Sequence, residues 1–297
     1  MKKVNKRKEP PKEFVDAVAA IDKDIREGNI VATNRYHHLR DDGRTALRKA
    51  LAEDQLFICV YCERSLEETV TKEVDGEIVE VKELKKNLVI EHFKPESIYN
   101  GKDGYKDLTL DYNNLFLACS GNVLRENLER ERTDRHQRIR LKNRTEHCDT
   151  SKGDSDFQYL KNPETWSEED ENVIKFDNGV ISADDEGLRQ ELQGTFNPQN
   201  QGIQRPFNLH LNEQKLLETR QEIWEGVKSK ISNKFKELTG KEISYKTWGT
   251  GGKMLVRIAR VYKNRYLDGY PKDNPTHYLE FRSAVLYQLH QRFRGKL

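Results

Sequence analysis

The chain has 297 residues, of which 34% are charged and 35% hydrophobic, and its formal net charge is only +2. That length accommodates one large core or two smaller ones, and the polar composition favours small, helix-rich cores over large sheets. The near-balanced charge does not by itself indicate a nucleic-acid partner. No apolar run approaches the ~20 residues that span a bilayer. The basic first residues precede no apolar segment of a secretory signal, so we expect a cytoplasmic protein.

The first 56 residues are expected to form a helical segment. Apolar side chains recur at helical spacing from Phe14 to Ile25, the chain breaks at Gly28-Asn29, and a second helix is expected over residues 43–54. Residues 1–8 are basic. We interpret them as a solvated tail, with contact to phosphates as the alternative.

The middle of the chain predicts short strands. Residues 56–62 favour a strand that leads into a cysteine pair, and Asp75-Gly76 predicts a hairpin over residues 67–84. Residues 88–92 form a short β-rich run, residues 99–111 a loop, and residues 115–118 an extended or helical segment. The stretch 125–144 is rich in arginine and acidic residues, which indicates an exposed helix or ordered loop.

The remainder predicts one hairpin and then helices. Asn178-Gly179 is a turn signal inside residues 173–181. From about Asn212 the pattern is helical, with a break at residues 250–252 and further helices over 254–267 and 277–293. We therefore divide the chain into an N-terminal helical segment (1–56), a core (57–195) and a helical C-terminal region (196–297). The fold class expected is α+β within a mostly helical chain.

The cysteines carry the strongest signal. Cys59 and Cys62 form a C-x2-C pair, followed by Cys119 and Cys148. Thiols stay reduced in the cytoplasm, and four thiolates make a closed tetrahedral zinc site. The alternative is that some of them are buried structural thiols, which is common for free cysteine. We predict a structural zinc site with all four as ligands.

A second group of residues suggests hydrolytic chemistry. Glu91 offers a hard oxygen to Mg²⁺ or Mn²⁺, and His92 has a suitable pKa for a general base. Because neighbours on a strand point to opposite sides of the pleat, one can hold metal while the other meets water. The alternatives are a surface carboxylate and a hydrogen-bonded structural histidine.

Four further residues complete the predicted site. Asn114 is expected to bond the backbone of the hairpin and orient His92, or to cap a helix. Asp149 and His147 flank Cys148, and either is a candidate for the remaining metal ligand. Lys152 is a candidate phosphate contact, with an exposed lysine as the alternative.

Taken together, these segments resemble a known family. They resemble the PtuB-like HNH endonucleases of Septu anti-phage systems and of some retrons. The segments that carry the resemblance are Cys59-Val60-Tyr61-Cys62-Glu63-Arg64, Ile90-Glu91-His92-Phe93-Lys94-Pro95, residues 112–119, and His147-Cys148-Asp149 with Lys152-Gly153-Asp154. The resemblance covers about residues 57–154. It implies a ββα-metal core, His92 as general base, Glu91 as a ligand of the catalytic metal and Asn114 as the middle residue of the motif. The last ligand of that metal is then either Asp149, which holds the motif's final position, or His147. It also implies an ATPase partner, PtuA, and a role in defence.

Two basic surfaces are candidates for nucleic-acid contact. Arg257, Arg260 and Asn264 lie on one face of a predicted helix. Arg138 is the candidate contact from the arginine-rich stretch 125–144. Phosphate contacts of this kind give salt-dependent, sequence-poor affinity. An acidic partner or a solvated, salt-bridged helix would have the same pattern.

The function expected from the sequence is a metal-dependent endonuclease that hydrolyses phosphodiester bonds, with duplex DNA as the first substrate. Two alternatives stay open. One is an RNase with the same chemistry, for example one that cleaves tRNA, because the 2′-OH is read by surfaces that the motif does not include. The other is a catalytically silent, zinc-stabilised adaptor that binds nucleic acid or a partner.

Overall fold

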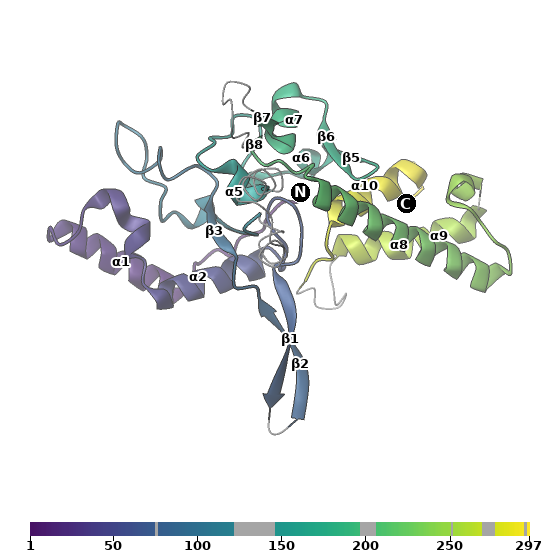
Figure 1. Cartoon of the computed structure of the whole chain (residues 1–297), viewed down its shortest axis with the longest axis horizontal. Helices are drawn as coiled ribbons and strands as arrows, with labels where there is room; N and C mark the ends of the chain where they lie inside the picture. Colours follow the sequence, from purple (N-terminus) through teal and green to yellow (C-terminus); the bar gives the residue numbers. More distant parts are fainter. Residues whose placement is uncertain (75–76, 122–145, 197–205, 251, 269–276, 294–295) are drawn as a thin grey trace, which may run out of the picture.

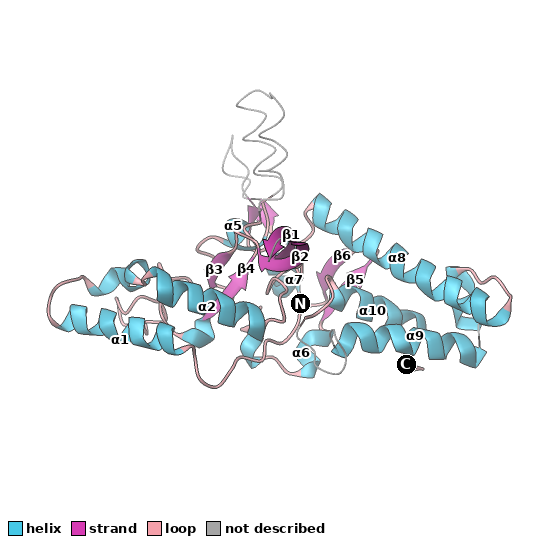
Figure 2. Ribbon diagram, turned by 90° about the horizontal axis from the view of Figure 1, so that it is seen from below, coloured by secondary structure: helices cyan, strands magenta, loops and turns pink. Residues whose placement is uncertain are grey.

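The computed structural model describes residues 1–74, 77–121, 146–196, 206–250, 252–268, 277–293 and 296–297. Helices gather at the two ends of an elongated molecule, and short strands lie between them (Figures 1 and 2). The fold is α+β, as predicted. Within the described residues, no helix is both long enough and apolar enough to cross a membrane.

Two antiparallel helices form the N-terminal end. They are α1 (Lys12–Arg26) and α2 (Asp41–Asp54), joined through the 3₁₀ segment η1 (Ala32–His38). The predicted helices are confirmed, and Gly28 ends the first of them with φ +77°. Phe14 and Ile21 of α1 and Leu47 and Leu51 of α2 are buried, as the helical spacing of apolar residues requires.

The first eight residues are not a solvated tail, and that prediction is wrong. Met1 and Val4 are buried. The Lys6 ammonium donates to the carbonyls of Tyr112 and Leu115, and Arg7 pairs with Asp54 at 2.8 Å. Two apolar side chains in a basic segment are enough to dock it, because its cations find carbonyl and carboxylate partners on the surface that it covers.

The predicted strand over residues 56–62 is also wrong. This segment is a series of turns, with a single bridge between Ile58 and Ser65. Leu56 and Phe57 have φ angles of 49° and 60°, in the left-handed region that bulky residues seldom adopt. The chain turns before Cys59 and again between Cys59 and Cys62, and these turns override the β propensity of the residues.

Within the described ranges, the strands form four separate antiparallel pairs. Their bounds are β1 (Glu67–Val74) with β2 (Glu77–Leu84), β3 (Val89–His92) with β4 (Leu115–Ala118), β5 (Ile174–Asp177) with β6 (Val180–Ala183), and β7 (Thr195–Phe196) with β8 (Pro206–Phe207). The first pair projects from the body as an arm (Figure 1). The predicted hairpins over 67–84 and 173–181 are confirmed, as is the strand over 88–92. Residues 115–118 are extended, and the turn residue Asn178 has the expected positive φ of 47°.

Short helices lie in the central part of the chain, and longer helices form its C-terminal part. The short elements are η2 (Tyr112–Asn114), α5 (Cys148–Lys152), η3 (Pro163–Thr165), α6 (Glu168–Asn172) and α7 (Glu186–Gln193). The C-terminal elements are α8 (Gln214–Thr239), η4 (Tyr245–Thr250), α9 (Gly252–Asp268) and α10 (Arg282–Phe293). The C-terminal helices confirm the prediction, although the last one starts five residues later than expected.

Buried apolar side chains form two clusters. The first core extends from the N-terminal segment to β6 and α7 and reaches Leu216 and Phe281. The second core lies between α8, α9, α10 and η4, and it contains Val227, Ile231, Phe235, Trp248, Leu255, Ile258, Ala259, Val285, Leu289 and Phe293. The predicted division into three segments stays a prediction, because the first core itself includes the start of α8 and of α10.

Candidate metal centre and the polar site beside it

The turns after α2 bring the first two cysteines into one concave surface. Cys59 N–H donates to the Arg64 carbonyl at 2.8 Å, and Glu63 N–H donates to the Cys59 carbonyl at 3.1 Å. The Gln55 side chain fixes this loop to β4, since its amide donates to the Leu117 carbonyl and accepts from Leu117 N–H, both at 2.7 Å. Our sequence reasoning did not identify Gln55, although an amide between a helix and a C-x2-C pair is a usable signal.

The other two cysteines meet because the chain returns to Gly121 at residue 147. His147 N–H donates to the Gly121 carbonyl at 3.2 Å. Gly121 has φ +66°, and a Cβ there would lie 1.7 Å from the His147 carbonyl oxygen, so only glycine permits this crossing. Cys148 N–H then donates to the Leu209 carbonyl at 2.9 Å, which ties the fourth cysteine to the segment before α8.

The four sulfur atoms are arranged for a metal ion. All lie within 4.8 Å of one another. Cys62 Sγ is 3.6 Å from Cys119 Sγ, and Cys59 Sγ is 4.0 Å from Cys148 Sγ. A tetrahedral zinc site with bonds of about 2.3 Å has sulfur–sulfur edges of about 3.8 Å, whereas a disulfide requires about 2.05 Å. The predicted four-cysteine cluster is confirmed, and its dimensions fit zinc.

Proximity of the thiols changes their acidity. Hydrogen bonds from Cys148, Cys59 and Cys62 lower the pKa of Cys119 well below its ordinary value. Burial raises the pKa of Cys62 and of Cys148 well above it. A metal ion bound here therefore displaces protons, and its affinity depends on pH.

Two polar side chains surround the cysteines. His147 is fully buried, and its Nε2 lies 3.7 Å from Cys119 Sγ. The Arg220 guanidinium donates to the carbonyls of Gly179 and Leu211. Burial lowers the pKa of Arg220 to about 10, and the charges of Cys62 and Cys148 oppose that shift. His147 thus faces the cysteine cluster, and Arg220 offsets its negative charge.

Glu91 lies on the inner side of β3. It is 4% exposed, and its Oε1 accepts from the Tyr61 hydroxyl at 2.9 Å and pairs with Lys152 Nζ at 2.8 Å. Lys152 is itself 2% exposed and also donates to the His92 carbonyl at 2.8 Å. The alternatives of an exposed lysine and of a surface carboxylate are therefore excluded, because both residues are buried and each neutralises the other.

Asp149 completes this group from the first turn of α5. Burial would raise the pKa of Glu91, but the charge of Lys152 and hydrogen bonds with Asp149, Lys152 and Tyr61 outweigh it and lower that pKa. Burial, then a hydrogen bond and repulsion from Glu91, raise the pKa of Asp149 to about 9. Glu91 is thus the more acidic carboxyl of the pair, and Asp149 is the one that holds a proton more tightly. Of the two candidates that flank Cys148, Asp149 is the one beside Glu91.

His92 points to the other side of β3, as expected for its neighbour on a strand. Its Nε2 lies 2.9 Å from the Thr109 carbonyl. Since a carbonyl only accepts, Nε2 carries the proton and Nδ1 keeps a lone pair. The Tyr36 ring meets the imidazole edge-on, with centroids 4.8 Å apart at 82°.

Asn114 holds the loop that supplies this carbonyl. Lys94 N–H donates to its Oδ1 at 2.8 Å, and its Nδ2 donates to the carbonyls of Lys94 and Leu108 at 3.0 and 3.1 Å. Lys94 is two residues after His92, and Leu108 directly precedes Thr109. The predicted bond from Asn114 to the hairpin backbone is confirmed.

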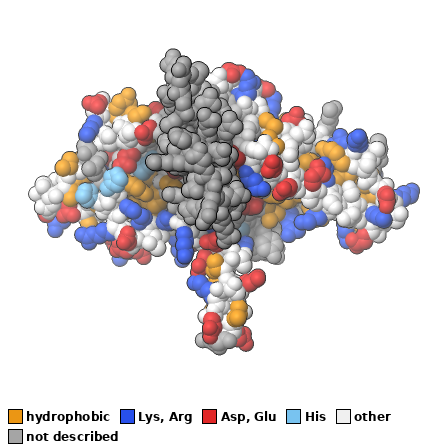
Figure 3. Space-filling view, viewed as in Figure 1, with side chains coloured by type: hydrophobic (Ala, Val, Ile, Leu, Met, Phe, Trp, Pro, Cys, Tyr) orange, Lys and Arg blue, Asp and Glu red, His pale blue; other side chains and the backbone are white. Residues whose placement is uncertain are grey.

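The predicted nucleic-acid contacts lie elsewhere or outside the described residues. Arg138 belongs to the undescribed segment. Arg257 and Arg260 are exposed on α9, at the end of the molecule away from β3 (Figure 1). They line a groove of about 730 Å³ whose other charged residues are Lys253, Arg292 and Lys296. Asn264 is half-buried on the same helix. On the face shown in Figure 3, basic and acidic side chains are otherwise interspersed.

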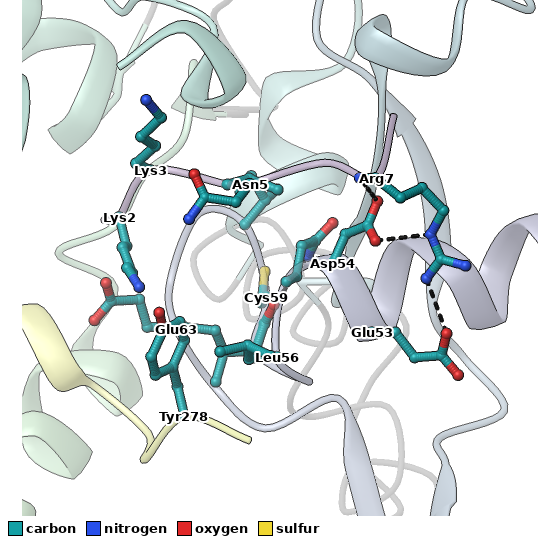
Figure 4. A pocket seen from close by; sticks show the side chains of 14 residues that line it. Lys2, Lys3, Asn5, Arg7, Glu53, Asp54, Leu56, Cys59, Glu63 and Tyr278 are labelled. Atoms are coloured by element: carbon teal, nitrogen blue, oxygen red, sulfur yellow. Dashed lines mark hydrogen bonds and ion pairs between the residues drawn. The ribbon is translucent and has the colours of Figure 1, made fainter. Parts of the chain in front are cut away.

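A separate cavity of about 390 Å³ lies behind the metal centre, between the first residues and the end of α2 (Figure 4). Cys59 forms part of its wall, and the Arg7 side chain points to Asp54 and Glu53 at its rim. The cavity contains none of the predicted catalytic residues. The docked N-terminal residues form one of its walls.

In the described part of the chain, the four cysteines are the one group of three or more close metal-binding side chains. Glu91 and Asp149 offer two carboxylates to a second ion. Comparison with known proteins adds nothing to this picture: no protein-family model, curated protein or solved structure matches the chain.

Proposed function

We propose that this protein is a metal-dependent endonuclease of the HNH type, which hydrolyses phosphodiester bonds of DNA. The observation that carries the proposal is His92, whose Nε2–H is fixed by the Thr109 carbonyl at 2.9 Å. Nδ1 is then the nitrogen that can take a proton from water. One strand position away, on the opposite side of the pleat, lies the Glu91–Asp149 carboxyl pair.

The carboxyl pair is the binding site proposed for the catalytic divalent ion. When bound, Mg²⁺ or Mn²⁺ would supply charge neutralisation at the phosphate and at the leaving oxygen. Binding of the ion would require Asp149 to be deprotonated, and Lys152, which pairs with Glu91 at 2.8 Å, is the residue proposed to contact the phosphate. Asn114 keeps the Thr109 carbonyl in place, so that the His92 imidazole is oriented before substrate arrives.

The proposed substrate and partner draw on the groove beside α9 and on the sequence resemblance. Among the residues that the structure describes, the lining of the groove on α9 includes basic side chains and no acidic one, which suits a phosphate backbone. The resemblance to PtuB-like nucleases suggests an ATPase partner of the PtuA type and a role in anti-phage defence. RNA remains the alternative substrate, because the cleaved bond is the same.

The test is cleavage of supercoiled plasmid and of total cellular RNA with Mg²⁺ or Mn²⁺. We expect the wild-type protein to nick or linearise the plasmid. His92→Ala should lose this activity and keep its zinc content and helicity. His290→Ala, which removes an exposed histidine from α10, is the matched control. Equal cleavage by the His92 and His290 variants would contradict the role of His92. Cleavage of RNA alone would select the RNase.

One observation favours a second function, a catalytically silent adaptor stabilised by zinc. Glu91 is buried and already satisfied by Lys152 and Tyr61. If that pair is permanent, β3 has a structural role and the protein binds nucleic acid or a partner without turnover. Tight binding of DNA that is independent of Mg²⁺, with no cleavage in the presence of a co-purifying ATPase, would identify this function.

A further inference from the structure

An arginine without a carboxylate partner lies beside the His92 site. Arg44 of α2 has a buried Nε with no hydrogen-bond partner in the described part of the chain. No ion pair of Arg44 is formed within that part either. A guanidinium has five N–H donors, and burying one of them unpaired costs free energy.

The neighbouring cations differ from Arg44 in this respect. One turn further along α2, Arg48 donates to the carbonyls of Leu88 and Lys85 at 3.1 and 3.3 Å. Lys94 pairs with Asp156 at 2.7 Å. The charge or the donors of each are thus committed to the fold, whereas no side-chain hydrogen bond or ion pair of Arg44 is formed within the described residues.

Tyr36 connects Arg44 to His92. The Arg44 Cζ atom lies 5.4 Å from the Tyr36 ring centroid, and the same ring meets the imidazole of His92 edge-on at 4.8 Å. Burial raises the pKa of Tyr36, against the opposing charges of Arg44 and Arg48, so its hydroxyl remains a donor at neutral pH. The negative charges of Glu96 and Asp149 also raise the pKa of Tyr36.

We propose that Arg44 and Tyr36 form an anion-binding subsite that holds a phosphate of the nucleic-acid backbone next to His92. This inference rests on the proposed function and deepens it, since it assigns the part of the protein that grips substrate at the site itself. The planar guanidinium presents parallel N–H donors that match two phosphate oxygens. A bound phosphate would give the Arg44 guanidinium the anionic partner that it lacks among the described residues.

The experiment measures affinity without turnover. Binding of a fluorescein-labelled 20-base-pair DNA duplex is followed by anisotropy in EDTA-free buffer without Mg²⁺ or Mn²⁺, over a series of salt concentrations. Arg44→Gln should weaken binding about 10- to 100-fold, the range for losing a hydrogen bond to a charged group. The slope of log affinity against log salt should fall by about 1.

Two further variants make the result specific. Lys49→Gln removes the same charge from an exposed position of α2 and should change affinity less than 2-fold. Arg44→Lys keeps the charge but loses the planar fork, so it should give an intermediate loss even if Arg44→Gln proves unstable. Zinc content and the melting temperature are measured for each variant.

The outcomes separate this proposal from the one on which it rests. If Arg44→Gln binds like Lys49→Gln with the same salt slope, the subsite is overturned, whether or not the protein cleaves DNA. Absence of any DNA binding by the wild-type protein overturns it as well. If Arg44→Gln alone loses affinity while no cleavage is found, the subsite stands and the hydrolytic function fails.

Discussion

The two cores are held together by different forces. Around the cysteines the elements are very short: β3 and β4 have four residues each and α5 has five. Such elements are unstable alone, and side chains such as Gln55, Asn114 and Lys152 fix them to one another. The second core instead has helices of 26, 17 and 12 residues, α8, α9 and α10, that pack apolar faces together.

This difference shows where a metal ion matters. A helical bundle acquires its stability from buried apolar area, at roughly 25 cal/mol per Å². The cysteine region buries charged and polar groups, each of which requires a partner, and its four thiols come from three separate parts of the chain. We therefore expect the two regions to respond independently to changes in metal and in packing.

Loss of the metal should have the largest effect. Cys148→Ser removes one of four ligands, and binding of structural zinc contributes about 10–16 kcal/mol in small zinc domains. We expect this variant to lose zinc and to unfold the first core. Fluorescence of Trp166 reports on that core, and fluorescence of Trp248 on the second core.

The comparison predicts that the Trp248 signal persists, measured with Trp166 and Trp224 replaced by phenylalanine. Strong chelation of the wild-type protein should reproduce the result. Simultaneous loss of both signals would show that the cores are one cooperative unit.

A cavity in the second core should have the next largest effect. Leu289 is fully buried on α10, so Leu289→Ala should lower the free energy of unfolding by about 2–5 kcal/mol. Zinc content should not change. Urea unfolding checks the first statement and metal analysis the second. Leu267→Ala on α9, where the side chain is 41% exposed, is the control. Loss of zinc from the Leu289 variant would show that the two cores do not respond independently.

Asn114→Ala tests the polar network of the first core. It removes three hydrogen bonds and leaves the backbone groups of Lys94 and Leu108 without them. We expect a cost of about 1–3 kcal/mol together with loss of any His92-dependent cleavage, because the Thr109 carbonyl is no longer fixed. Asn113→Ala changes the exposed neighbour and should be neutral in both thermal melting and cleavage. Full activity of Asn114→Ala would assign it a purely structural role.

The smallest effect is one of pH. Burial lowers the pKa of Lys6 from 10.5 to about 7. Between those values the unfolded state binds more protons, so the free energy of unfolding should rise with pH from about 7 to 10.5. Lys6→Met should flatten that rise, and Lys8→Met, which changes an exposed lysine, should not. Urea unfolding at pH 7, 8, 9 and 10 measures the slopes, and identical slopes for Lys6→Met and wild type would contradict the assignment.

Local signals in the sequence predicted much of this structure. Asp75-Gly76 and Asn178-Gly179 are turn signals in the sequence, so both hairpins could be placed from two residues each. The four cysteines were also predictable, since a C-x2-C pair in a chain with so few cysteines leaves few alternative roles. The α8–α10 helices followed from the regular spacing of apolar residues.

The errors come from contacts between distant segments. The turns at Leu56 and Phe57 are imposed by the cysteine cluster, not by local propensity. Docking of Lys6 depends on carbonyls of residues 112 and 115, and burial of Lys152 depends on Glu91, more than 60 positions earlier. The helix α7 carries its own N-cap, Asp185, which was a signal that our sequence reasoning did not use.

The separation of the cysteines along the chain has a consequence for biosynthesis. Cys59 and Cys148 are 89 positions apart, which corresponds to roughly 4–18 s of translation at about 5–20 residues per second. During that interval the nascent chain displays one to three thiols without the fourth. Cys148 is also anchored by the Leu209 carbonyl, so the centre can close only after α7 has been made. Zinc delivery is thus expected late in synthesis, and a cell short of zinc would accumulate chains vulnerable to oxidation at these thiols.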